Sequence, residues 1–174
     1  AMPAAAADLD ALFATITAAP VHLLGYSMGG RLALYFARHY PHRLRSLLLE
    51  SSSPGLATAE ERDARRRRDN ALADWIETHD ITAFVERWEA LPLWVSQTAV
   101  PATKRAALRA QRRQNDRRGL ANSLRGMGTG VQPALWNELP ALSLPVQLIA
   151  GELDEKFIRI NKKMAALLPA ARLE

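Results

Sequence analysis

The sequence predicts an α/β fold in which a helical lid insertion interrupts a parallel sheet. Short apolar runs at 21–24, 44–50 and 146–150 alternate with helical periodicity, and this alternation is typical of parallel sheets. The periodicity is helical throughout the segment between the second and third runs. We therefore expect a first core part, a helical lid and a second core part, at 1–56, 57–137 and 138–174.

Each element follows from its local pattern. We expect helices at 8–18, 31–39 and 164–168. We expect strands at 21–24, 44–50 and 146–150, and the insertion separates the last two strands. The second helix ends near Pro41, because proline lacks the amide hydrogen that a continuing helix needs. A parallel sheet of this kind is expected to carry helices on both faces.

The most specific motif is Gly-Tyr-Ser-Met-Gly-Gly at 25–30, a G-x-S-x-G match between a predicted strand and a predicted helix. In that context a sharp turn lifts the Ser27 hydroxyl clear of the sheet edge. Glycines two residues before and two after the serine, Gly25 and Gly29, are expected to let strand and helix approach. The helix N-terminus would stabilise an oxyanion. The alternative is a glycine-rich turn whose serine has no catalytic role.

A carboxylate and four histidines bear on this interpretation. Asp154 follows the third strand, so the same sheet edge could hold it and Ser27. A nucleophile followed by an acid is the chain order of α/β-hydrolases, in which histidine comes third. All four histidines instead precede Asp154, and we expect them at surface or helix-terminal positions: His22, His39, His42 and His79.

Composition sets the broad class. The 174 residues suggest one domain, with 48% hydrophobic and 24% charged residues, as in ordinary soluble proteins. No run approaches the ~18 apolar residues of a membrane span. The absence of cysteine excludes disulfides and thiolate metal sites and fits a cytoplasmic protein.

The net charge of +5 comes mostly from arginine and fits either a polyanionic small molecule or nucleic acid. The arginine-rich runs at 62–68 and 112–118 are interleaved with acids and lack an aromatic stacking pattern. We therefore rank a nucleic-acid-binding fragment last and expect no nucleic-acid partner.

Several stretches closely resemble the MenH family, the 2-succinyl-6-hydroxy-2,4-cyclohexadiene-1-carboxylate synthases of menaquinone biosynthesis, which have the α/β-hydrolase fold. The resemblance runs from about Val21 to the end of the chain, and its stretches lie at 22–31, 50–56, 119–130 and 151–157. Many hydrolases share the serine turn. The stretch in the insertion is more specific, because lids vary freely between hydrolase families.

The resemblance implies a carbon–oxygen lyase that eliminates pyruvate from a polycarboxylated cyclohexene precursor without metal or cofactor. It makes Ser27 the catalytic base or nucleophile and Asp154 the residue that orients the histidine of a Ser-His-Asp triad. The backbone N–H of Met28 supplies half of the oxyanion hole.

The resemblance also implies substrate contacts. Tyr26 and Arg31 flank the serine turn, and the candidates elsewhere are Arg65, Trp88, Arg109 and Lys156. The choice of Arg65 is open, because four arginines follow one another at 65–68. Arginine suits a polycarboxylate, since its guanidinium is always charged and binds carboxylates bidentately. The alternative for the run at 62–68 is a solvated helix face paired with nearby acids. The remaining tryptophans are expected in the core of the lid: Trp75, Trp94 and Trp136.

Family members have strands before the serine turn and a Gly-His segment after the acid. We therefore expect this chain to be a fragment, inactive alone, with open sheet edges that favour self-association. A competing interpretation is a generic serine hydrolase, an esterase or C–C bond hydrolase, which the lid and Arg31 would distinguish from the synthase.

Overall fold

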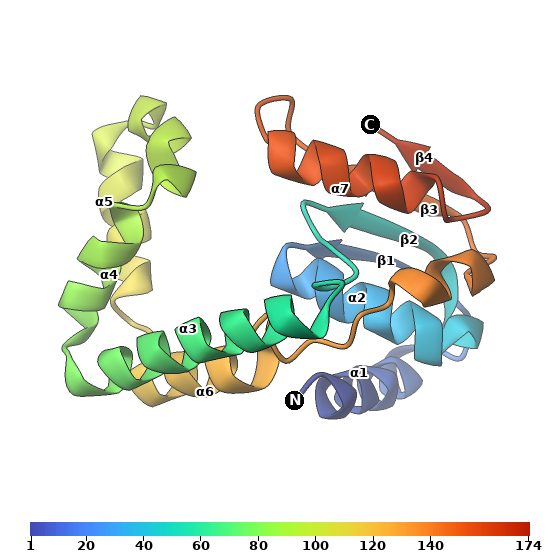
Figure 1. Ribbon diagram of the computed structural model, residues 1–174, viewed down its shortest axis with the longest axis horizontal. Helices are drawn as coiled ribbons and strands as arrows, with labels where there is room; N and C mark the ends of the chain where they lie inside the picture. Colours follow the sequence, from blue (N-terminus) through green and yellow to red (C-terminus); the bar gives the residue numbers. More distant parts are fainter. The chain divides into compact units, whose positions relative to one another are not determined.

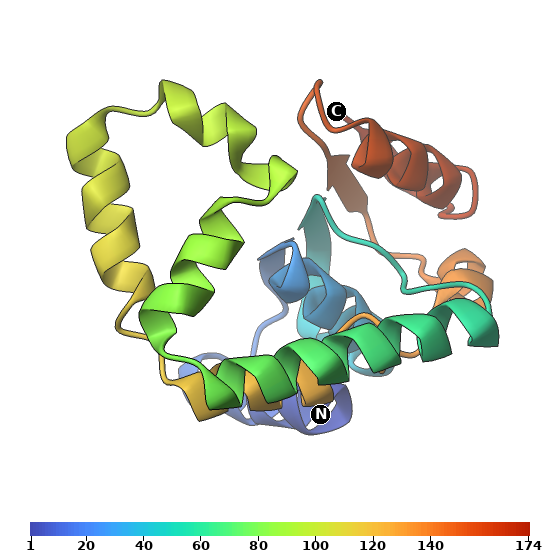
Figure 2. The same ribbon diagram turned by 60° about the vertical axis from the view of Figure 1, so that its left-hand side comes forward.

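The computed structural model describes residues 1–174 except for the side chain of Ser96, and the chain divides into two compact units. The sheet unit comprises residues 1–63 and 129–174, and the helical unit comprises residues 64–128. Figures 1 and 2 show the elements of both units. Each unit is described by itself.

Four parallel strands form the sheet in the order β1-β2-β3-β4 (Figure 1). They are β1 (Val21–Tyr26), β2 (Leu44–Glu50), β3 (Val146–Ile149) and β4 (Ala171–Leu173). The first three match the predicted strands. The fourth was missed, because its three residues have no apolar run of their own and become a strand by pairing with β3.

The helices of the sheet unit cover one face of the sheet. They are α1 (Met2–Ile16), α2 (Met28–His39) and α7 (Glu155–Ala165), with short 3₁₀ segments η1 (Pro41–Arg43) and η3 (Trp136–Ala141). Helix α2 contacts β1 and β2, α7 contacts β3 and β4, and α1 packs on α2. One hydrophobic core joins all three helices to alternate strand residues such as Leu47 and Leu49. The expectation of helices on both faces is therefore wrong for the helices of this unit.

Residues of β1 that alternate with the core positions are exposed. Leu24 keeps 59% of its surface accessible and Tyr26 keeps 57%. Strand β1 ends the strand order, so it presents an unpaired edge as well as this apolar surface.

We expect the isolated chain to self-associate through β1. Its apparent mass, measured by size-exclusion chromatography with light scattering, should rise with protein concentration. The Leu24→Lys variant should shift the distribution toward monomer, because a charge on an edge strand opposes pairing. A wild-type chain that stays monomeric at every concentration would contradict this expectation.

The helical unit contains most of α3 (Ala59–Thr78) together with α4 (Ile81–Glu89), η2 (Pro92–Ala99), α5 (Ala102–Arg112) and α6 (Arg117–Met127). As predicted, its described residues form no strand. Asp80 and Asp116 cap α4 and α6 by accepting hydrogen bonds from backbone amides. Helix α6 runs alongside α3 in Figures 1 and 2, and Arg125 of α6 pairs with Asp74 and Glu77 of α3 at 2.6 and 2.8 Å.

Across the described residues, we find no helix with both the length and the apolar character that a bilayer span requires.

Candidate active site

Ser27 lies on a strained turn at the carboxyl end of β1. Its φ of 51° and ψ of −112° are uncommon for a residue with a side chain. Its N–H donates to the Glu50 carbonyl of β2 at 2.9 Å, and its carbonyl accepts from the Arg31 N–H at 3.1 Å. The side chain is exposed and does not cap α2. The turn therefore presents the serine hydroxyl at the sheet edge, as predicted.

Two glycines make this turn possible. A Cβ added at Gly25 would lie 2.6 Å from the Gly29 carbonyl oxygen and from the Gly30 Cα. A Cβ at Gly30 would lie 2.6 Å from the Ser52 Cβ and 2.7 Å from the Gly25 oxygen. A Cβ at Gly29 would meet nothing within 4 Å. The expectation for Gly25 thus holds, whereas the one for Gly29 is wrong, and Gly30 is the second required glycine.

Met28 and Tyr26 flank the serine. Met28 is the first residue of α2, so its N–H lies at the positive end of the helix dipole, where an oxyanion is stabilised. Tyr26 is the last residue of β1 and pairs in register with Glu50. Both residues therefore lie beside Ser27 at the carboxyl edge.

Asp154 lies at the same edge of the sheet. It follows β3 and caps α7 by accepting a hydrogen bond from the Phe157 N–H at 3.1 Å. Strand β2 separates β1 from β3, so their carboxyl ends are about 10 Å apart. Ser27 and Asp154 thus follow the carboxyl ends of two strands at the same edge of the sheet, with β2 between them.

The histidines of the sheet unit lie elsewhere. His22 is near the start of β1, with Nδ1 2.6 Å from the Ser46 hydroxyl oxygen of β2. His39 and His42 come just before β2, and the strands are parallel, so both lie toward the amino edge. His79 belongs to the helical unit and stacks on Trp75 with ring centroids 4.2 Å apart. Within the described sheet unit, no histidine occupies the edge that holds Ser27.

Arg31 has a partner that the sequence did not indicate. Its Nη1 donates to the Gln132 Oε1 at 3.1 Å, and the Gln132 Nε2 donates to the Ser53 carbonyl at 3.1 Å. Gln132 was placed in the insertion, whereas it lies in the sheet unit. Its partners Ser53 and Arg31 are separated from it by 79 and by 101 positions in the sequence, and no local sequence pattern predicts contacts over such distances.

Lys156 lies in the first turn of α7, two residues after Asp154. Its side chain is exposed, and its Nζ lies 4.8 Å from the Phe157 ring centroid, a cation–π contact. Its contact with substrate stays a prediction.

The helical unit brings Arg65 and Trp88 together. Both line a groove of about 680 Å³. Two further arginines, Arg68 and Arg87, line the same groove. Arg68 was an alternative to Arg65 in the sequence, whereas Arg87 was not singled out. The Arg65 Nε donates to the Asp69 Oδ1 at 2.8 Å, an i,i+4 pair of the kind expected for a solvated helix face. Arg65 thus forms a helical ion pair and also lines a cationic groove.

Arg109 is held apart from that groove. Its Nε and Nη2 lie 2.7 and 2.6 Å from the Glu89 Oε2, and the Arg112 Nη1 lies 2.8 Å from the Glu89 Oε1. It lines a separate cavity of about 260 Å³ beside Trp94. Burial disfavours the charged form of Glu89, but hydrogen bonds from both arginines outweigh it and hold the pKa of its carboxyl below the usual value.

We expect Glu89→Gln to destabilise the chain at pH 7 and to have little effect at pH 3. A lowered folded-state pKa stabilises the fold above the unfolded value of about 4.3, and that contribution is lost as pH falls through the folded value. Urea unfolding at both pH values measures the difference. Glu155→Gln is the matched control, since Glu155 and Arg159 form an exposed pair at 3.4 Å. An equal Glu89→Gln effect at both pH values would contradict the expectation.

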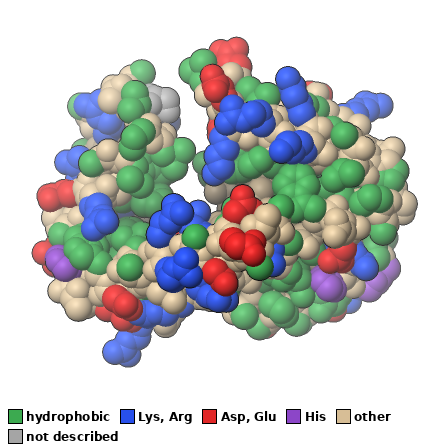
Figure 3. Space-filling model, viewed as in Figure 1, with side chains coloured by type: hydrophobic (Ala, Val, Ile, Leu, Met, Phe, Trp, Pro, Cys, Tyr) green, Lys and Arg blue, Asp and Glu red, His purple; other side chains and the backbone are tan. Residues whose placement is uncertain are grey.

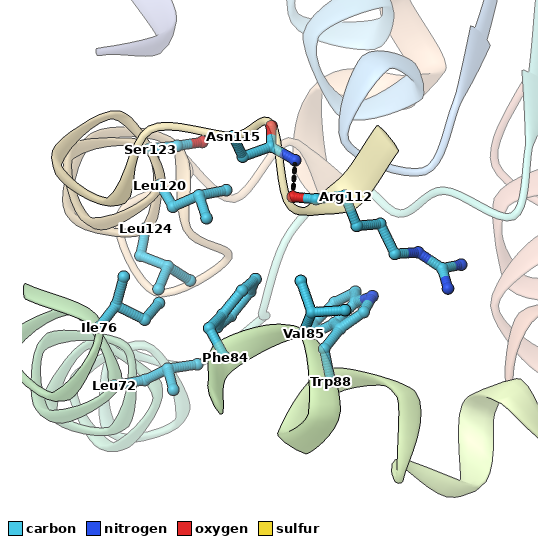
Figure 4. Close-up of a pocket in the computed structure, with 10 residues that line it drawn as sticks. All are labelled: Leu72, Ile76, Phe84, Val85, Trp88, Arg112, Asn115, Leu120, Ser123 and Leu124. Carbon is cyan, nitrogen blue, oxygen red and sulfur yellow. Dashed lines mark hydrogen bonds between the residues drawn. The ribbon is translucent and has the colours of Figure 1, made fainter. Parts of the chain in front are cut away.

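An apolar pocket of about 280 Å³ also lies in the helical unit (Figure 4). Figure 4 shows Leu120 and Leu124 of α6 facing Phe84 of α4 and the α3 side chains, with Trp88 at the other end. The Asn115 amide donates to the Arg112 carbonyl at its rim. Trp88, Phe84 and Leu72 line both this pocket and the cationic groove, so the two cavities share a largely aromatic wall.

The tryptophans occupy packed positions. Trp136 packs against the core of the sheet unit, and its indole N–H donates to the Gly55 carbonyl at 2.9 Å. Trp94 and Trp88 have ring centroids 5.5 Å apart, and the Arg112 guanidinium lies 5.3 Å from the Trp94 ring centroid. The expectation of Trp136 in the core of the lid is wrong, because it packs against the core of the sheet unit instead.

The charges of the molecule are mixed in sign. On the face shown in Figure 3, basic and acidic side chains are interspersed along α3. In the part of the chain that the structure describes, no group of three or more potential ligands could hold a metal ion.

Residues 1–174 match the family described as the alpha/beta hydrolase fold. The chain belongs to the alpha/beta hydrolase family. The parallel sheet, the strained serine and the acid two strands away are the features of this fold that the chain contains.

Two proteins are similar to this alpha/beta hydrolase over nearly its whole length. It is 48% identical over 167 residues to the Bacillus subtilis (strain 168) protein named "Putative 2-succinyl-6-hydroxy-2,4-cyclohexadiene-1-carboxylate synthase", covering 96% of this chain and 61% of that protein. It is 38% identical to MenH from S. aureus, with a TM-score of 0.94, covering 99% of this chain and 65% of that one.

A third similar structure is an esterase. The thermophilic esterase from Thermogutta terrifontis, whose structure is described as malate bound, is 26% identical with a TM-score of 0.80. The match covers 99% of this chain and 62% of the esterase. The chain thus spans about three-fifths of the length of these relatives.

Proposed function

We propose that this chain serves in a 2-succinyl-6-hydroxy-2,4-cyclohexadiene-1-carboxylate synthase, which eliminates pyruvate from a polycarboxylated cyclohexene. The observation that carries the proposal is the exposed Ser27 on a strained turn, within a chain 48% identical to a relative named for that activity. The whole protein would work in the cytoplasm on a small soluble substrate.

In the proposed reaction the Ser27 hydroxyl, activated by a histidine, takes a proton from the substrate ring. In this step the hydroxyl proton of Ser27 passes to the histidine. The electron pair of the broken C–H bond forms a ring double bond, and the C–O bond to the pyruvate group breaks with its pair on oxygen. The leaving enolate takes up the proton held by the histidine and becomes pyruvate. Asp154 orients the histidine. The Met28 N–H, at the helix N-terminus, stabilises negative charge that develops on the substrate.

Carboxylates of the substrate would bind arginine. Arg31 lies one helical turn after Ser27, since its N–H donates to the Ser27 carbonyl. Tyr26 ends the strand before it, and Lys156 follows Asp154. In the helical unit, Arg65 and Trp88 share one groove and Arg109 lines another cavity. That this unit is a lid, and that these residues contact substrate, remain predictions.

A chimera tests the function. This chain replaces the 65% of S. aureus MenH that it covers, and pyruvate release from the cyclohexene precursor is followed with lactate dehydrogenase and NADH. We expect pyruvate release by the chimera and none by the 174-residue chain alone, because no histidine of the sheet unit lies near Ser27. A folded chimera that releases no pyruvate, beside an active S. aureus enzyme, would refute the proposal.

A serine esterase is the second candidate, and the similarity to the Thermogutta terrifontis esterase favours it. The same chimera distinguishes the two functions. Rapid p-nitrophenyl acetate hydrolysis that depends on Ser27, without pyruvate release, would support the esterase.

A further inference from the structure

We propose that Gln132 is a positioning residue, which holds the Arg31 guanidinium at the carboxyl edge of the sheet to receive a substrate carboxylate. This inference rests on the proposed function, since it concerns how the same site binds a polycarboxylate. It assigns a role to a residue outside the catalytic groups.

The Gln132 amide is buried and uses both of its ends. Only 1% of the residue is exposed. Its Oε1 accepts from the Arg31 Nη1 and its Nε2 donates to the Ser53 carbonyl, each at 3.1 Å. A guanidinium can only donate and a carbonyl can only accept, so these two partners allow one orientation of the amide. A buried amide without both bonds would be costly, which keeps Gln132 in this position.

The backbone around Gln132 is equally constrained. Gly55 has a φ of 98°, and a Cβ there would lie 2.9 Å from the Pro133 carbonyl oxygen. The Leu135 N–H donates to the Pro54 carbonyl at 2.8 Å. These contacts join the loop that follows β2 to the segment that carries Gln132. The segment that carries the amide is therefore held by backbone contacts with that loop as well as by the contact with Arg31.

Arg31 is tied to the serine turn at its other end. Its backbone N–H donates to the Ser27 carbonyl, and its guanidinium donates to Gln132. Both ends of the residue are therefore held relative to the serine turn. The Gln132 amide is neutral, so its hydrogen bond orients the guanidinium without adding an opposite charge of its own. A substrate carboxylate at Arg31 would gain a charge-assisted hydrogen bond from a group that is already oriented.

Two substitutions of similar size test the inference on the 174-residue chain. Gln132→Met removes the Oε1 that accepts from the Arg31 Nη1, and Gln132→Glu keeps an acceptor but adds a negative charge. Both lose the donor to Ser53, so that loss is matched between them. Gln147→Met, in β3, is the control for the substitution itself. The readouts are the ¹⁵N NMR signal of the Arg31 Nε–H and the affinity for succinate, a dicarboxylate probe.

In the wild-type chain we expect the NMR signal to report slow rotation of the Arg31 guanidinium. This rotation should become fast in Gln132→Met and stay slow in Gln132→Glu. Succinate affinity should fall about tenfold in both, because one variant loses the orientation and the other opposes the charge. In the chimera, Gln132→Met should raise KM by about tenfold and leave kcat nearly unchanged, since Arg31 binds substrate away from the reacting atoms.

The inference is overturned if Gln132→Met behaves like Gln147→Met in both measurements, or if succinate leaves the wild-type Arg31 signal unchanged. An unchanged KM for Gln132→Met in an active chimera also overturns it. A chimera without pyruvate release refutes the proposed function instead. In that case the NMR and succinate measurements on the chain still decide the role of Gln132.

Discussion

Ser27→Ala should abolish pyruvate release by the chimera, with kcat lowered by roughly 10⁴- to 10⁶-fold. The physical reason is that the hydroxyl on this strained turn is the proposed proton acceptor, and alanine offers no oxygen in its place. Substrate binding should change little, because the arginines that would hold the carboxylates are untouched. Single-turnover kinetics and substrate titration measure the two effects separately.

Ser51→Ala is the matched control for this experiment. Ser51 also has a positive φ, 45°, and it follows β2 at the same sheet edge, with its N–H donating to the Ile149 carbonyl at 3.0 Å. Its substitution removes a hydroxyl from similar backbone geometry and should leave kcat nearly unchanged. Comparable losses in both variants, or substantial activity in Ser27→Ala, would show that Ser27 is not the reactive group.

Gly30→Ala should lower the free energy of unfolding of the chain by about 3 kcal/mol, the upper range for overpacking. The added Cβ would lie 2.6 Å from the Ser52 Cβ and 2.7 Å from the Gly25 carbonyl oxygen. Gly25→Ala should be at least as costly, because all three of its close neighbours are backbone atoms. Urea unfolding followed by circular dichroism measures both, and the thermal midpoint should fall by roughly 6–12 °C.

Gly29→Ala is the control, from the same turn and the same substitution. A Cβ there meets nothing within 4 Å, and alanine is favoured over glycine within a helix by up to about 1 kcal/mol. This variant should therefore be neutral or slightly more stable. The expectation is contradicted if Gly29→Ala and Gly30→Ala lower the free energy of unfolding equally. The close approach of strand, helix and loop would then not explain why the turn requires glycine at position 30.

The two experiments address different properties of one turn. The glycines at 25 and 30 let β1, α2 and the loop after β2 approach each other, and this approach holds Ser27 in its unusual conformation. A variant that loses a glycine is expected to lose stability first, and activity as a consequence. Ser27→Ala is expected to lose activity while it keeps the fold.

The sequence by itself determined the strand, the serine turn and the helix that follows it, because these depend on neighbouring residues. It also placed Asp154 after a strand at the same edge, because parallel strands align their carboxyl ends. The absence of a histidine from that edge of the sheet unit followed from chain order in the same way.

Only the tertiary structure decided the remaining features. It identified Gly30 rather than Gly29 as the second required glycine, because the Ser52 side chain that meets it comes from another loop. It made β4 a strand through pairing with β3 and gave Gln132 its contact with Arg31 across 101 positions. Contacts between residues so far apart in the sequence depend on how the elements pack, and the local periodicity of the sequence does not predict that packing.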